Sequence, residues 1–156
     1  MAAAGYHVKG IDLSRGSIDT AAKRSIGIPN INFACENAFH LSARDDSYDA
    51  VLLLDFLEHV EDPSHVFREI YRILKPGGIF GFVTPNKNGI IVRARSFIPS
   101  RIAERIVETL YGRKEEDIFE VHYRTNTVED ITCTASSVGF QTRTLLQNAD
   151  PSYKSF

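Results

Sequence analysis

Five apolar residues stand in a row at Ala50–Leu54, and an acidic residue, Asp55, follows them. A strand with one solvated face alternates apolar and polar residues, whereas a strand covered on both faces is apolar throughout. The run follows a polar turn at residues 42–47. It therefore predicts a strand that is buried on both faces, and such strands belong to parallel sheets with helices packed on each side.

The sequence on both sides of this run alternates strand and helix patterns with short connections, which is typical of a parallel α/β sheet. Strands are predicted over residues 6–12, 31–35, 48–54 and 79–84. Helices are predicted from Ser14 or Ser17 to about Arg24 and from Asp62–Pro63 to Leu74, with Lys75–Gly78 as the stop. Beyond residue 86 we expect a helix over 101–111, a helix over 127–137 that ends at Gly139, and a strand over 140–146.

Charge and composition exclude several classes of function. Eighteen Lys and Arg residues against twenty Asp and Glu give a net charge of -2, whereas a general nucleic-acid binder needs an excess of basic residues. No apolar run approaches the roughly 20 residues of a membrane-spanning helix, and residues 1–5 do not resemble a signal peptide. Cys35 and Cys133 are far apart and form no CxxC pair. We therefore expect no metal site and a reducing, cytoplasmic location.

Two residues suggest chemistry by their type and position. Asp12 ends the first predicted strand, where an acid either caps the next helix or accepts hydrogen bonds from the two hydroxyls of a ribose. His59 follows the buried strand by a few residues. Histidine exchanges protons near neutral pH, which makes His59 a candidate general base.

Four segments, taken in order, carry a resemblance to a known family. They are YHVKGIDLS at 6–14, NINFACENAFHL at 30–41, SYDAVLLLDFLEHVEDP at 47–63 and ILKPGGIFGFVTPN at 73–86. Together they resemble the class I S-adenosylmethionine-dependent methyltransferases, in the type 11 small-molecule branch. The resemblance runs from about Gly5 to Asn86 and is weaker over 122–125 and 138–140. It implies a Rossmann-like sheet with helices on both faces, S-adenosyl-L-methionine as cofactor and a small-molecule methyl acceptor.

The resemblance assigns cofactor contacts to residues that follow predicted strands. It implies ribose binding for Asp12, adenine contacts for Leu13, Asn37 and Ala38, and contacts to the methionine part for Leu54 and Asp55. Asn37 stands where the family usually carries Asp, and apart from the resemblance it is a loop residue. Asp55 alternatively only ends its strand. His59 either acts as a base toward a substrate hydroxyl or shapes the pocket.

The resemblance also divides the single domain, residues 1–156, into three parts. Residues 1–86 are the expected cofactor-binding core, 87–126 a variable lid or substrate region, and 127–156 a C-terminal helix and strand. Residues 89–110 combine apolar side chains with four arginines. This segment is either a lid packed on its own domain or a surface for peripheral membrane contact or a lipidic or anionic substrate. His122 and Tyr123 either face the substrate or are ordinary strand residues.

One part of the family pattern does not occur in these 156 residues: the glycine-rich D-x-G-x-G-x-G loop after the first family strand. The resemblance thus implies a partial domain that begins after this loop and lacks the central strand, which would lie between strands 6–12 and 49–54. We expect those two strands either to close up or to receive another segment. The alternatives are a methyltransferase-like remnant or interaction subunit that binds no cofactor, and a nicotinamide-dependent oxidoreductase.

Overall fold

The computed structural model describes residues 1–84, 122 and 124–143. In chain order the elements are η1 (Ala2–Ala4), β1 (Val8–Asp12), α1 (Arg15–Arg24), β2 (Ile31–Cys35), β3 (Tyr48–Leu54), η2 (Leu57–His59), α2 (Pro63–Ile73), β4 (Leu74–Val83) and α5 (Val128–Val138). The helix predicted over 101–111 lies outside the described residues. Of the strand predicted over 140–146, residues 140–143 have no regular secondary structure, and the rest lies outside the described residues. Within the described ranges, no helix is long and apolar enough to cross a membrane.

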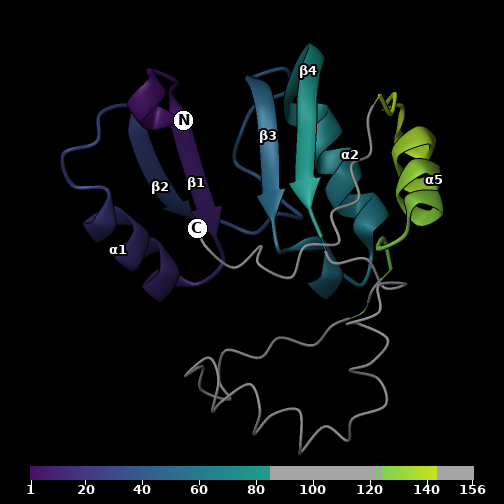
Figure 1. The fold of residues 1–156 in the computed structure, drawn as a ribbon, viewed down its shortest axis with the longest axis horizontal. Helices are drawn as coiled ribbons and strands as arrows, with labels where there is room; N and C mark the ends of the chain where they lie inside the picture. Colours follow the sequence, from purple (N-terminus) through teal and green to yellow (C-terminus); the bar gives the residue numbers. More distant parts are fainter. Residues whose placement is uncertain (85–121, 123, 144–156) are drawn as a thin grey trace, which may run out of the picture.

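The strands form two separate parallel pairs, β1 with β2 and β3 with β4. Figure 1 shows all four arrows pointing the same way, with β1 and β3 as inner neighbours and β2 and β4 outside them. The predicted parallel α/β organisation is therefore confirmed. No hydrogen-bonded ladder joins β1 to β3 in the part of the chain that the structure describes. The two strands have not closed up, and no other described strand lies between them.

Side-chain caps fix the starts of the three helices. The Ser14 hydroxyl accepts a hydrogen bond from the Ser17 N–H (3.3 Å) at the start of α1. Asp62 accepts from the His65 N–H (3.4 Å) before α2, and Thr127 accepts from the Asp130 N–H (3.1 Å) before α5. These bonds satisfy helix N–H groups that have no intrahelical partner. The predicted helix starts are confirmed.

The Lys75–Gly78 segment behaves differently from the prediction. Helix α2 already ends at Ile73, and the segment belongs to β4. Tyr48 pairs with Leu74 and Ala50 pairs with Ile79, so the segment forms a bulge in the ladder between β3 and β4. Gly77 has a φ of 79°, a conformation that residues with a Cβ rarely adopt.

The described core is built around α2. Val66 and Phe67 of this helix are fully buried, and the Phe67 ring lies 5.0 Å from the ring of Phe80 and 6.3 Å from that of Phe140. Phe80 comes from β4, whereas Phe140 follows α5. This aromatic cluster therefore joins α2, β4 and the end of α5.

The expectation that the 50–54 strand is buried on both faces is wrong. Val51 and Leu53 pack against the core, but Leu52 is 50% exposed and Leu54 is 69% exposed. Ile79, which pairs with Ala50, is 66% exposed. Successive strand residues face opposite sides of a sheet. One face of the β3–β4 pair is therefore packed, while the other is apolar and uncovered among the described residues.

We expect Phe67→Ala to lower the free energy of unfolding by about 3–5 kcal/mol, because it removes a fully buried ring and leaves a cavity. Urea denaturation followed by circular dichroism measures this loss. Ile26→Ala, at a side chain that is 83% exposed, is the control and should change stability by less than about 0.5 kcal/mol. Equal effects of the two substitutions would contradict the proposed core.

Candidate functional site at the carboxyl ends of the strands

The parallel strands place their carboxyl ends along one edge of the structure, where open α/β sheets bind ligands. Asp12 is the last residue of β1, and Asn37 lies two residues beyond β2. Leu54 is the last residue of β3 and precedes Asp55, and Thr84 follows β4. The arrowheads in Figure 1 mark this edge. The structure therefore brings the predicted cofactor-binding residues of different strands to one side of the molecule.

Asp12 serves the start of α1, which is one of the two roles that the sequence left open. Its Oδ1 accepts a hydrogen bond from the Ser14 N–H (2.7 Å) at the entry to α1, so the carboxylate does serve the helix start. Its Oδ2 has no hydrogen-bond partner among the described residues, and the side chain is exposed. Leu13 beside it is 72% exposed. One carboxylate oxygen and an apolar surface are thus available to a ligand.

Asn37 holds a tight turn after β2. Its Oδ1 accepts from the Phe39 N–H (3.0 Å), and its carbonyl oxygen accepts from the His40 N–H (2.9 Å). Ala38 between them is half-buried. The side-chain oxygen of Asn37 is therefore used locally, and the Nδ2 donor is the group that it can offer to a ligand.

Asp55 adopts a left-handed backbone conformation, with a φ of 47°. Its N–H donates to the Val83 carbonyl (3.2 Å), which extends the contact between the β3 and β4 chains by one residue. A non-glycine residue in this region costs about 1–2 kcal/mol. Backbone strain of this kind clusters at functional sites. The exposed carboxylate of Asp55 thus stands on a constrained backbone beside the exposed Leu54.

Glu58 is a candidate that the sequence reasoning missed. It lies in η2, is only 6% exposed, and its carboxylate accepts from the Thr84 hydroxyl (3.4 Å). The Thr84 hydroxyl in turn accepts from the Asn126 side-chain amide. The Glu58 carbonyl accepts from the His122 N–H (2.7 Å). Burial raises the pKa of Glu58. The only signal in the sequence is the position of this acid in the short segment FLEHV, where three of its four companions are apolar.

Of the three remaining predicted site residues, the structure describes two. His59 is half-buried in η2, next to Glu58. His122 is half-buried, and its backbone is bound to Glu58. Tyr123 lies outside the described residues. The structure thus brings His59 and His122 to the same buried acid, although their roles toward a substrate stay predictions.

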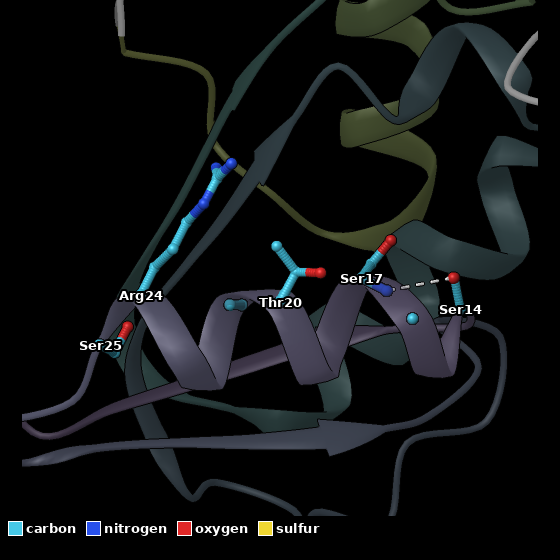
Figure 2. Close-up of a pocket in the computed structure, with 7 residues that line it drawn as sticks. Ser14, Ser17, Thr20, Arg24 and Ser25 are labelled. Carbon is cyan, nitrogen blue, oxygen red and sulfur yellow. Dashed lines mark hydrogen bonds between the residues drawn. The ribbon is translucent and has the colours of Figure 1, made fainter. Parts of the chain in front are cut away.

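A separate open hollow of about 710 Å³ lies along α1. Figure 2 shows its polar lining, with Ser14, Ser17, Thr20, Arg24 and Ser25 along one side of the helix. None of the residues predicted to bind cofactor lines it. In the described ranges no group of three or more His, Cys, Asp or Glu residues is placed to hold a metal ion.

Comparison with known proteins identifies relatives of the chain. A family model described as a methyltransferase domain matches residues 1–82. The ubiquinone biosynthesis O-methyltransferase of Chromobacterium violaceum is 40% identical over 91 residues, which are 56% of this chain and 39% of that protein. The protein of the same name from Ralstonia nicotianae is 35% identical over 120 residues, which are 75% of this chain and 48% of that protein.

A solved methyltransferase structure is also similar to this chain. The crystal structure of a SAM-dependent methyltransferase from Methanosarcina mazei matches with a TM-score of 0.66 at 26% identity. That match covers 88% of this chain and 70% of the other. The chain spans less than half the length of the two curated relatives.

We expect the stability of Glu58→Gln, relative to the parent chain, to rise as the pH increases from about 4 to about 8. Burial raises the pKa of Glu58 above its ordinary value of 4.5, so the folded state holds this proton more tightly than the unfolded state. This favours folding below pH 4.5, and the advantage is lost as the pH rises through the folded-state pKa. Glutamine stays neutral throughout. Urea denaturation at a series of pH values measures the difference.

Glu69→Gln is the matched control with the opposite sign. The hydrogen bond from Arg72 lowers the pKa of Glu69, so the ionised carboxylate favours folding and this contribution is fully present above pH 4.5. Glu69→Gln should therefore lose stability relative to the parent as the pH rises to about 5 and then change little up to about 8. The same trend in both variants would contradict the assigned burial of Glu58.

Proposed function

Because the chain belongs to the methyltransferase domain family and has the class I S-adenosylmethionine-dependent fold, we propose that it binds S-adenosyl-L-methionine and takes part in methyl transfer to a small molecule. The observation that carries the proposal is the common edge that exposes Asp12, Asn37 and Asp55. All three residues fall within the part of the chain that matches the family.

The residues at this edge fit the proposed cofactor. When bound, S-adenosylmethionine supplies an electrophilic methyl group whose transfer depends mainly on alignment with the acceptor. The unpartnered Oδ2 of Asp12 suits ribose hydroxyls, and the exposed Leu13 offers an apolar surface for the base. The Asp55 carboxylate suits the ammonium group, and the exposed Leu54 beside it adds apolar surface.

We further propose that the acceptor carries a hydroxyl group and has a lipid-like character. Two curated relatives named ubiquinone biosynthesis O-methyltransferases support this class of acceptor. A hydroxyl that is methylated on its oxygen would have to release its proton to a base. His59 is proposed to accept this proton, because it is a half-buried imidazole on the turn that follows β3 and Asp55.

We expect Asp12→Asn to weaken the binding of S-adenosylhomocysteine, the methyl-transfer product, by about 10- to 100-fold in calorimetric titration. The amide keeps an oxygen for the Ser14 N–H but loses the charge and the second acceptor that suit the ribose. Asp49→Asn is the control, since Asp49 is exposed near the start of β3 and pairs with Lys75. It should leave the affinity unchanged.

The parent chain gives the decisive comparison. Saturable binding by the parent supports the proposed cofactor, and the two Asn variants then test its placement. If a demonstrably folded parent bound no S-adenosylhomocysteine, the chain would be a methyltransferase-like protein without a cofactor, and the proposed function would be wrong.

We expect His59→Gln to lower kcat for methylation of an alkylated catechol by about 10²- to 10⁴-fold while leaving the affinity for S-adenosylhomocysteine unchanged. Transfer of a labelled methyl group measures the rate. His65→Gln is the control, because His65 lies in α2 against the rings of Phe39 and His40. A rise in KM without a fall in kcat for His59→Gln would assign His59 to pocket shape instead.

A further inference from the structure

Glu36 closes a short loop at the carboxyl end of β2. Its Oε1 accepts a hydrogen bond from the Ser42 hydroxyl (2.8 Å), and its Oε2 accepts from the Ser42 N–H (3.1 Å). One carboxylate thus closes residues 36–42 into a loop. Lys9 of β1 donates to the same Oε1 (2.6 Å) and ties the loop to that strand. The hydrogen bond from Lys9 lowers the pKa of Glu36, so the carboxylate is ionised at neutral pH and can accept from all three donors.

The 36–42 loop carries Asn37, an exposed residue with one side-chain group left to offer. The Asn37 Oδ1 accepts from the Phe39 N–H (3.0 Å). Because only the oxygen of an amide can accept this bond, it fixes the orientation of the side chain, and the Nδ2 has no hydrogen-bond partner among the described residues. Phe39 packs against buried residues of α2, which holds the turn from its inner side. The Nδ2 donor therefore stands on a constrained turn.

Glu36 also connects this turn to Asp12, the acid proposed to bind the ribose. The Glu36 N–H donates to the Asp12 carbonyl (3.1 Å), one bond beyond the paired residues of β1 and β2. The Cys35 thiol, just before Glu36, donates to the Leu13 carbonyl (3.2 Å). The Asp12 carboxylate and the Asn37 amide, an acceptor and a donor, are therefore held on one bonded backbone framework.

We propose that Glu36 is a positioning residue for cofactor binding: by closing the 36–42 loop, it holds the Asn37 amide where its Nδ2 donates to an acceptor nitrogen of the cofactor's base. Adenine offers such acceptors in its ring nitrogens. The oxygens of Glu36 are engaged within the protein, so Glu36 acts through Asn37. A donor that is already fixed does not have to be ordered when the ligand binds, which favours affinity. This inference rests on the proposed function.

Calorimetric titration of Glu36→Gln with S-adenosylhomocysteine tests this role. Glutamine has the same shape, but it loses the charge that pairs with Lys9 and keeps only one acceptor oxygen. We expect the affinity to fall by about tenfold. Asp45→Asn is the matched control, because Asp45 lies on the same connection between β2 and β3 and makes an equally short bond to Arg72 (2.6 Å) outside the closed loop. It should change the affinity by less than about twofold.

A double-mutant cycle with Asn37→Ala separates positioning from a general loss of structure. Asn37→Ala removes the proposed donor and should itself weaken binding by about tenfold. If Glu36 acts through Asn37, adding Glu36→Gln to Asn37→Ala should weaken binding by less than about a further twofold. Fully additive losses would overturn the proposal. It would also be overturned by parent-like affinity of either single variant, or by equal losses in Glu36→Gln and Asp45→Asn.

Ser42→Ala keeps the test decisive if circular dichroism shows that Glu36→Gln does not fold. It removes the hydroxyl at an exposed position and leaves the N–H bond to Glu36, so we expect a loss of about threefold in affinity. Parent-like affinity of folded Ser42→Ala would then overturn the proposal. If the folded parent bound no S-adenosylhomocysteine, the proposed function would fail and this inference with it. Binding by the parent with unchanged affinity in the loop variants would overturn the positioning role alone.

Discussion

The division of the strands into two pairs is the constraint on which the rest of the structure depends. Because no ladder joins β1 to β3 among the described residues, other contacts must connect the halves. The connection between β2 and β3 is held at one end by Lys9, which pairs with Glu36 (2.6 Å). At the other end Arg72 of α2 donates to the carbonyls of Leu41 and Ala43. Side-chain contacts of Lys9 and Arg72 thus anchor the chain that connects the two strand pairs.

The residues of the candidate site are likewise divided between the two strand pairs. Asp12 and Asn37 belong to the β1–β2 half, whereas Asp55 and the buried Glu58 network belong to the β3–β4 half. A ligand that contacts residues of both halves depends on how the two halves are held.

The features that the sequence could predict depend on residues that are close together in the chain. The strands Ile31–Cys35 and Tyr48–Leu54 were predicted with their correct bounds, because turn residues flank short apolar runs. The caps at Ser14, Asp62 and Thr127 depend on residues three positions apart. The exposure of Leu52 and the burial of Glu58 depend on which distant segments cover them. A strand pattern does not contain that information, and Thr84 and Asn126 are far from Glu58 in the chain.

Amide hydrogen exchange along β3, measured by NMR, tests directly whether only one edge of this strand is paired. We expect an alternating pattern of exchange rates, because only alternate N–H groups of β3 pair with β4. The amides that face β4 should be protected, and those that face β1 should exchange about 100-fold faster. Uniform protection along Tyr48–Leu54 would mean that both edges of β3 are paired, and it would contradict the divided sheet.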